Sequence, residues 1–291
     1  MTVGELAAWW LSEYAPTQHV EPSSLVRYKY YLTKQILPKF ATTKVADINR
    51  RVVAHWVTND LARQLAPKTC NDTLAFFKKL FNDARRDEVV AENPIGLVRR
   101  VPLQRAEDQH WTEAQARTFL TTVKREAPKL HDVFSFALQT GMRLGEIAAL
   151  KCDVVDVSQR ERGMVWVKRT WCQKTRVIKE YTKTKQARVV PLNQDLQAIL
   201  LAMQAHGSAD TIWPANIDFK NLVRNLRSLA KKAGVPIITF HALRHTFASM
   251  WMASGKPQFG VGYEATFFRR VRSPKPSTRC STEMSSSSSS Q

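Results

Sequence analysis

A polar segment without hydrophobic periodicity, residues 99–110, divides the chain into two stretches that each have the pattern of a folded domain. Thr2 with Glu5 opens the first stretch, and Thr112 with Gln115 opens the second. In each pair the side chains can satisfy free backbone donors at a helix start, as in a capping box. A chain of 291 residues is long enough for two separate cores. The predicted division is a domain at 1–98, a linker at 99–110 and a second domain at 111–257.

Helices with short connections are predicted throughout the first domain, because apolar residues recur there near the helical period. The predicted starts are Thr2, Ser23 or Ser24, Asp47 or Asn49, and Pro67, whose missing N–H suits a first turn. The inward face of the fourth helix consists of Leu74, Phe77, Leu80, Phe81 and Ala84. Its predicted exposed face carries Lys78, Lys79, Arg85 and Arg86. These four are candidates for contact with a phosphate backbone, or form a solvated basic face.

The second domain combines helices with a small antiparallel sheet. A helix from about Leu130 ends at Gly141, the residue best able to adopt a left-handed cap. The predicted later helices are 144–151, 195–204, 217–233 and 241–253. Alternating segments at 164–169, 177–182 and 188–192 predict the strands. The fold class is therefore mostly α with a small antiparallel β-sheet.

Positive charge is concentrated in the second half of the chain. Of the formal net charge of +19, residues 1–98 contribute +3, with 13 Lys/Arg against 10 Asp/Glu, and residues 99–291 contribute +16, with 31 against 15. Residues 164–192 alone hold eight basic residues and one acid. Such a field attracts a polyanion, and nucleic acid is the commonest one, the alternative being a solvated basic surface.

Cysteine usage and hydropathy predict a protein of the cell interior. The four cysteines are scattered without a C-x-x-C pair, which argues against a disulfide scaffold or a thiolate zinc site. No apolar run approaches about 18 residues, and the N-terminus lacks a signal pattern. We expect a soluble protein without a membrane partner.

Three segments carry the candidate chemistry. Arg143 lies at a helix–turn–helix corner, where Glu146 can hold its guanidinium. His241 and Arg244, three residues apart, share one face of a helix. Between these two segments, 181–188 is a lysine-containing hairpin tip followed by Val-Pro-Leu. Arginines can grip a phosphodiester through charge and bidentate hydrogen bonds, while Lys or His can move protons at its bridging oxygens.

These segments, in this order, resemble the tyrosine recombinase (phage integrase) family. The matching motifs are Arg-Leu-Gly-Glu-Ile, the lysine hairpin before Val-Pro-Leu, and His-x-Leu-Arg-His-Thr-Phe-Ala-Ser. Residues 2–94 are similar to the helical, SAM-like core-binding domain of that family, and the resemblance covers about 2–257. It implies a catalytic domain that, with the core-binding domain, closes as a clamp on double-stranded DNA. Family members break and rejoin DNA through a 3′-phosphotyrosine, without metal or other cofactor, and act as homotetramers on paired sites.

The resemblance also implies roles for individual residues. Arg143 and Arg244 would clamp the scissile phosphate, and His241 would assist proton transfer. Lys183 would protonate the leaving 5′ oxygen, being preferred to Lys185 because it lies eight residues before Pro191, as in relatives. An ordinary turn lysine is the alternative. Supporting roles fall to Glu146, which would orient Arg143, and His245, for which we favour a buried structural role over a zinc pair with His241. Lys185 and Arg188 are further candidates for DNA contact.

The nucleophilic tyrosine of the family and the Leu-Gly-His segment before it do not follow Arg244. Tyr263 is the only later tyrosine, and it comes too soon for the family pattern. Residues 258–291 lack any period, end in a serine run, and are predicted to be a disordered, aberrant tail. We hypothesise a frameshift or truncation near Pro257, to be checked by reading the encoding DNA in its other frames.

Two functions therefore compete. The first is a site-specific recombinase of a mobile element such as a prophage, defective in this form and located in the bacterial cytoplasm at the nucleoid. The second is a non-catalytic DNA-binding remnant. A basic transcription regulator, a third possibility, has no specific support in the sequence.

Overall fold

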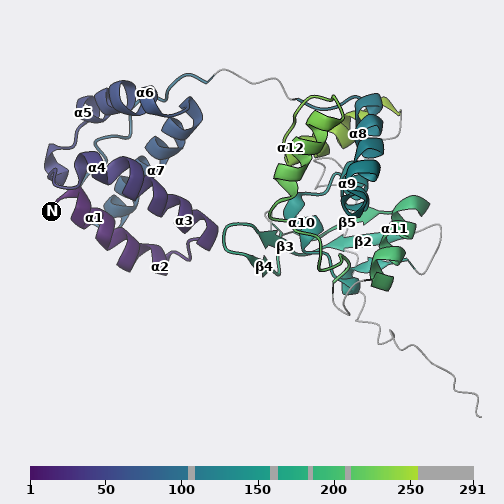
Figure 1. Ribbon diagram of the computed structural model, residues 1–291. Coiled ribbons are helices and arrows are strands. Elements are labelled where there is room, and N and C mark those ends of the chain that lie inside the picture. The colour runs from purple at the N-terminus through teal and green to yellow at the C-terminus, as the bar shows by residue number, and fades with distance from the viewer. Residues whose placement is uncertain (104–108, 158–162, 183–185, 207–210, 255–291) are drawn as a thin grey trace, which may run out of the picture. The chain divides into compact units, whose positions relative to one another are not determined.

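The computed structural model describes residues 1–103, 109–157, 163–182, 186–206 and 211–254, and it divides into two compact units, Met1–Glu107 and Asp108–Gln291 (Figure 1). Predicted features at Lys183, Lys185, Tyr263 and the segment 258–291 lie outside the described residues. The fold is mostly helical with small antiparallel sheets, which confirms the predicted fold class. None of the helices in these ranges combines the length and apolar character needed to cross a bilayer.

The first unit consists of helical segments around one aromatic core. Three of its helices continue through a π-helical turn. The segments are α1 (Val3–Trp9), a π turn (Trp10–Tyr14), α2 (Ala15–Thr17), α3 (Pro22–Tyr31), a π turn (Leu32–Ile36), α4 (Leu37–Phe40), a 3₁₀ turn (Val45–Asp47), α5 (Arg50–His55), a π turn (Trp56–Leu61), α6 (Ala62–Gln64) and α7 (Pro67–Arg86). The predicted inward face of α7 is fully buried against the rings of Trp10, Phe40 and Trp56.

Most of the predicted helix starts in this unit are confirmed. Thr2 and Glu5 form a capping box, the Asn49 side chain accepts a hydrogen bond from the Val52 N–H, and Pro67 occupies the first turn of α7. The predicted serine cap of the second helix is wrong. Glu21 is the N-cap there, without a side-chain bond, because Pro22 already has the fixed φ of a first helical residue and leaves Ser23 and Ser24 inside the helix.

The predicted exposed basic face of α7 is only half correct. Arg85 and Arg86 are exposed. Lys78 is half-buried, and its Nζ donates to the carbonyls of Gly96 (2.8 Å) and Val98 (2.6 Å). Burial, together with nearby Arg100, lowers the pKa of Lys78. The two hydrogen bonds of its Nζ, rather than its charge, therefore hold the turn that follows α7.

Lys79 is also half-buried, and it donates to the buried carboxylate of Asp83 at 2.7 Å. Asp83 accepts a second hydrogen bond from Trp10 Nε1 at 2.8 Å. A buried carboxylate needs such partners, which is why this lysine turns inward instead of extending into solvent.

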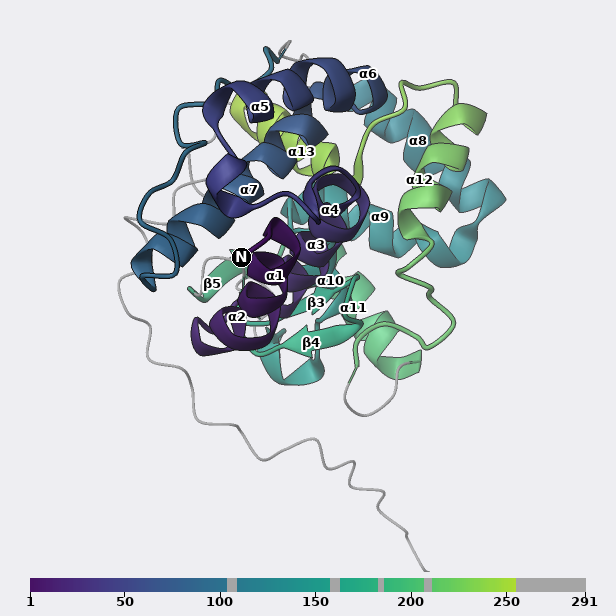
Figure 2. The ribbon, with the colours of Figure 1, turned by 90° about the vertical axis from the view of Figure 1, so that its left-hand side faces the viewer.

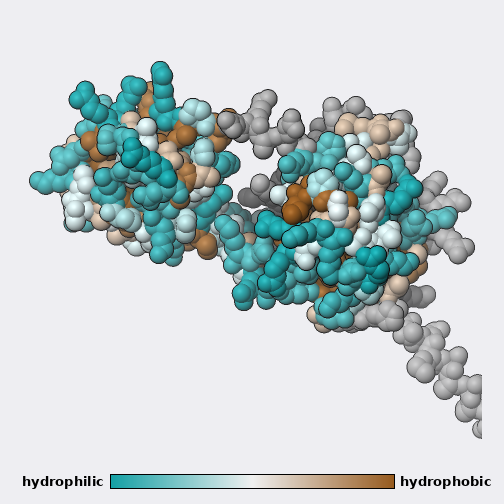
Figure 3. All heavy atoms as spheres, turned by 45° about the horizontal axis from the view of Figure 1, so that its top comes forward, coloured by the Kyte–Doolittle hydropathy of each residue, from teal (hydrophilic) through white to brown (hydrophobic). Residues whose placement is uncertain are grey.

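The second unit packs helices against two small sheets. Figures 1 and 2 both place α12 beside α8, where Lys232 pairs with Glu126 at 2.8 Å. Figure 3 shows hydrophilic side chains over most of the visible face of each unit. The elements are α8 (Glu113–Glu126), α9 (Pro128–Thr140), α10 (Leu144–Ala148), a 3₁₀ turn (Cys152–Val154), β1 (Val155–Asp156), β2 (Met164–Val167), β3 (Thr170–Cys172), β4 (Val177–Lys179), β5 (Arg188–Pro191), α11 (Gln194–His206), α12 (Leu222–Lys232) and α13 (Phe240–Ala253).

The prediction of a single sheet is wrong. The antiparallel order β1-β2-β5 forms one sheet, in which Val165 pairs with Val190, and β3 with β4 forms a separate hairpin, in which Trp171 pairs with Ile178. Arg169 lies between β2 and β3 and donates to Asp153 and Glu180. The first sheet loses this chain segment at Val167 and the hairpin begins at Thr170, a division that strand periodicity alone cannot predict.

The helix predicted at 217–233 begins later, at Leu222. Asp218 accepts hydrogen bonds from the backbone N–H of Lys220 (2.9 Å) and the side chain of Asn221 (2.6 Å). An aspartate in this arrangement stabilises a turn in place of helix, so the chain from Ile217 to Asn221 stays outside α12.

Trp111 fastens the start of the second unit to α13. Its ring is fully buried beside Phe119, and its backbone N–H donates to Thr246 Oγ1 at 3.0 Å. The indole Nε1 donates to the carbonyl of Pro236 at 2.8 Å. The backbone N–H of Trp111 is thus bonded to α13 itself, the helix that carries His241 and Arg244, and its indole to the segment just before that helix.

Gly145 allows α10 to lie directly against β3. A Cβ at this position would meet the carbonyl oxygen of Trp171 at 2.5 Å and Thr170 Oγ1 at 2.6 Å. The glycine is therefore required by the close approach of the two backbones.

We predict that Gly145→Ala lowers the free energy of unfolding by about 2 kcal/mol, because overpacking against a backbone cannot be relieved by a side-chain rotation. Urea titration followed by circular dichroism measures the change. Gly96→Ala is the matched control, since its Cβ would lie 3.6 Å from the nearest atom, and we expect an effect within about 0.5 kcal/mol. Equal effects of the two substitutions would contradict the packing argument.

Candidate functional site

The corner between α9 and α10 presents Arg143. Gly141 ends α9 in the left-handed conformation (φ 59°), as predicted, and a Cβ there would also collide with the ring of Phe247. Thr140 Oγ1 donates to the carbonyl of Phe136 at 2.6 Å and accepts from the Met142 N–H at 3.3 Å. Arg143 is the N-cap of α10. The backbone before it is held by Thr140, and its own backbone N–H is held by Glu146.

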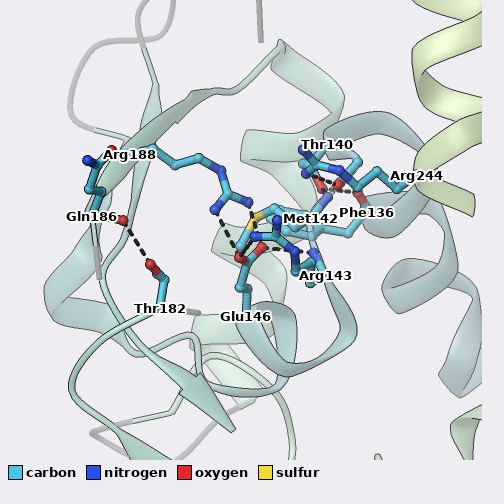
Figure 4. Close-up of polar contacts among 10 residues, drawn as sticks. Phe136, Thr140, Met142, Arg143, Glu146, Thr182, Gln186, Arg188 and Arg244 are labelled. Carbon is cyan, nitrogen blue, oxygen red and sulfur yellow. Dashed lines mark hydrogen bonds and ion pairs between the residues drawn. The ribbon is translucent and has the colours of Figure 1, made fainter. Parts of the chain in front are cut away.

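The carboxylate of Glu146 lies beneath Arg143 and is almost completely buried, with 1% of its side chain exposed. Oε1 accepts from Nη1 of Arg143 and Nη1 of Arg188, both at 2.9 Å. Oε2 accepts from the backbone N–H of Arg143 at 2.8 Å and Nη2 of Arg188 at 2.5 Å. Figure 4 shows both guanidinium groups directed at this carboxylate. Each oxygen thus has two donors, the full capacity of a carboxylate.

The pKa of Glu146 reflects this arrangement. Burial alone would raise it, but the hydrogen bonds and charge of Arg188, with the hydrogen bonds from Arg143, outweigh burial and hold the pKa below its ordinary value. Glu146 therefore remains ionised and fixes the position of the guanidinium of Arg143, whose side chain is 30% exposed.

Arg244 reaches the same corner from α13. Its Nη1 donates to the carbonyl oxygen of Gly141 at 2.9 Å, two residues before Arg143 (Figure 4). Thr239 caps the start of α13 by accepting from the Ala242 N–H. The structure therefore brings Arg143, Glu146 and Arg244 together, although 103 residues separate Arg244 from Gly141 along the chain.

The two histidines of α13 lie one turn apart. His241 is exposed and His245 is half-buried, and their rings are perpendicular with centroids 5.1 Å apart. His241 lies three residues before Arg244, near the start of the same helix. Among the described residues, no group of three His, Cys, Asp or Glu side chains is placed to hold a metal ion.

The hairpin predicted at 181–188 is wrong, because β4 pairs with β3 and β5 pairs with β2 in separate sheets. The segment is described only at its two ends, since Lys183 and Lys185 lie outside the described residues. Thr182 is buried, and its Oγ1 donates to the carbonyl of Gln186 at 2.8 Å (Figure 4). This hydrogen bond joins the residues on either side of 183–185. Arg188 follows two residues later, at the start of β5.

Sequence reasoning found the two arginines and Glu146 but missed the partner of Arg188. We expected Arg188 to be a candidate for DNA contact, whereas its guanidinium is bidentate on Glu146 and 17% of its side chain is exposed. The sequence carries no local signal for this pair, because 42 residues separate its members. The hydrogen bond of Thr182 was also missed, although its partner Gln186 is only four residues away.

Two guanidinium groups at one corner have the charge and the donors suited to an anion with several oxygens. Arg143 and Arg244 are both permanently charged, and guanidinium forks match the geometry of phosphate. The two hydrogen bonds of Thr140, the bond from Arg244 to Gly141 and the buried carboxylate of Glu146 hold the corner in the absence of a ligand, which reduces the entropy lost on binding.

Comparison with known proteins agrees with this geometry. Residues 109–261, more than half of the chain, match the model of the phage integrase family, and residues 2–61 match that of the phage integrase N-terminal SAM-like domain. The chain belongs to the phage integrase family, that is, to the tyrosine recombinases.

Two relatives are similar to the chain over different shares of its length. The ICEBs1 integrase of Bacillus subtilis is 24% identical over 136 residues, which are 47% of this chain and 37% of the relative. A XerC-like tyrosine recombinase of Caldanaerobacter subterraneus subsp. tengcongensis is 23% identical, over 88% of this chain and 74% of the relative. The chain thus spans about a third of the first relative and about three quarters of the second.

The Tn1549 transposon integrase, solved in complex with transposon right-end DNA, has the same fold. The TM-score is 0.72 at 19% identity, and the superposition covers 88% of each chain.

We predict that Glu146→Gln lowers the free energy of unfolding by roughly 3 kcal/mol at neutral pH, because it removes the charge shared by two partly buried arginines. The pKa of Glu146 is depressed in the folded state, so its stabilisation is complete above the ordinary carboxyl pKa, about 4.3, and is lost as the pH falls through the lower folded-state value. The difference between wild type and variant should therefore shrink on acidification.

Denaturant titrations at a series of pH values measure this difference. Glu113→Gln is the control, since the Glu113 side chain is 66% exposed and forms only a surface pair with Arg117. A constant difference at all pH values would rule out an ionised Glu146.

Proposed function

We propose that the chain has the double-stranded-DNA site of a site-specific recombinase, in which Arg143 and Arg244 clamp the scissile phosphate, and that this form is defective in strand cleavage. The observation that carries the proposal is the hydrogen bond from Arg244 Nη1 to the carbonyl of Gly141 (2.9 Å). Because Gly141 lies two residues before Arg143, this bond holds the side chain of Arg244 at the corner that presents Arg143. The formal net charge of +19 also favours a polyanionic ligand, because the electrostatic field of the chain attracts it.

Within this proposal each site residue has a distinct task. Arg143 and Arg244 neutralise the charge that develops on the nonbridging oxygens, and Glu146 orients Arg143. Lys183 protonates the leaving 5′ oxygen, and His241 assists proton transfer. His245 supports α13. The core-binding domain (1–98) and the catalytic domain (111–257) hold the duplex, and assembly of four protomers on paired sites completes the reaction.

We infer further that this 291-residue form binds its site without completing strand cleavage. Of the six tyrosines only Tyr263 follows Arg244, 19 residues later. A phosphate clamp without a nucleophile binds but forms no covalent intermediate, and loss of the nucleophile costs several orders of magnitude in rate in a serine protease, which also depends on a covalent intermediate. This observation favours the second candidate function, a DNA-binding protein derived from a recombinase of a mobile element, in the bacterial nucleoid.

A nicked suicide substrate separates the two functions. Duplexes enriched from a random pool by binding to the chain supply the site, and a denaturing gel detects any covalent protein–DNA adduct. We expect tight, salt-dependent binding, loss of at least tenfold in affinity in Arg143→Ala and Arg244→Ala, and no adduct.

An adduct that survives denaturation would show that the form is active, and its loss in Tyr263→Phe would identify the nucleophile. Failure to enrich any duplex would contradict DNA recognition itself.

We also predict which basic residues of α7 contact DNA. Arg85→Gln with Arg86→Gln should reduce the slope of log affinity against log salt by up to about 2, because each lost phosphate contact removes about one released counterion. Lys78→Gln should leave the slope unchanged and lower the free energy of unfolding by about 1 kcal/mol, since its Nζ is bound to two carbonyls. Binding isotherms at several salt concentrations and urea titrations measure the two effects.

A further inference from the structure

We propose that Arg188 is a positioning residue that acts on the phosphate through Glu146 and Arg143, and not a DNA contact. The inference rests on the proposed function of the Arg143 site. Arg188 presents both Nη atoms to Glu146, at 2.9 and 2.5 Å, in a fork-to-fork pair. A guanidinium committed in this way offers little to a phosphate, and 83% of its side chain is removed from solvent, since 17% is exposed.

The charge balance at Glu146 explains why a second arginine is needed. The carboxylate is 1% exposed, and burying it with only one partner carries a desolvation cost that a single ion pair often fails to offset. Arg143 supplies one side-chain donor and one backbone donor, and Arg188 supplies the other two. With Arg188 in place Glu146 stays ionised, and an ionised Glu146 is what holds Nη1 of Arg143.

The position of Arg188 in the sheet makes this support rigid. It begins β5, where it pairs with Val167 of β2, and β2 also pairs with β1. The carbonyl of Gln186, two residues earlier, accepts a hydrogen bond from Thr182 Oγ1. The ion pair between Arg188 and Glu146 therefore connects β5 to the corner between α9 and α10 that presents Arg143.

A double-mutant cycle tests the proposal in the full chain. Arg188→Gln should weaken binding of the selected duplex roughly tenfold in the wild-type background and should have no further effect in Arg143→Ala, because its influence passes through Arg143. Arg188→Lys, which keeps the charge and loses the fork, should remain folded and show a smaller loss with the same dependence on Arg143. Arg117→Gln, the same change of charge on the exposed face of α8, is the matched control and should leave affinity within about twofold.

Equal, additive losses from Arg188→Gln in both backgrounds would overturn the proposal in favour of direct phosphate contact. An effect no larger than that of Arg117→Gln would overturn it as well.

Thermal unfolding supplies a readout that does not depend on DNA. The single variant Arg188→Gln should lower Tm more than the double variant Glu146→Gln/Arg188→Gln. The single variant leaves a buried carboxylate short of hydrogen-bond donors, whereas the double variant has no carboxylate there. Additive changes in Tm would overturn the proposal. If the wild-type chain binds no duplex, the proposed function fails, and this unfolding cycle alone decides the role of Arg188.

Discussion

The buried carboxylate of Glu146 is the interaction on which the geometry of the site depends. It is removed from water and accepts four hydrogen bonds, two from Arg143 and two from Arg188. A buried charge is tolerated only when its partners are in place, so the carboxylate in turn fixes the segments that supply them. The corner after α9, the first turn of α10 and the start of β5 are joined at one point in this way.

Two glycines make that junction sterically possible. Gly141 adopts a positive φ that ends α9 and leaves room for the ring of Phe247, and Gly145 allows α10 to touch the backbone of β3. Arg143 and Glu146 lie beside these glycines in sequence because the same short turn must bend, approach a strand and cap a helix. The order of residues in this motif thus follows from backbone geometry as much as from the chemistry of the arginine.

Features set by local physics could be predicted from the sequence. The capping boxes at Thr2 and Thr112, the left-handed end at Gly141 and the pairing of Arg143 with Glu146 all depend on residues within four positions of each other. The convergence of Arg143 with Arg244 depends on long-range packing. It entered the sequence analysis only through the resemblance to a family.

Features set by distant partners could not be predicted. Lys78 and Arg188 both carry a charge that a pattern assigns to the surface, yet each is held by groups 18 or more residues away. The ion pairs of Arg169, which lies between the two sheets, likewise involve Asp153 and Glu180, 16 and 11 residues away. The π-helical turns of the first unit were not predicted, because the helical period used for the prediction assumes the hydrogen-bond spacing of an α-helix throughout.

The anchoring of Trp111 means that the entrance to the second unit and the helix bearing Arg244 are fixed to one another. The backbone of Trp111 is bonded to Thr246, two residues after Arg244, and its indole to Pro236, just before α13. A displacement of the backbone at Trp111 would therefore reach α13 and Arg244 directly, whereas Arg143 is held through Glu146 and Arg188 of β5.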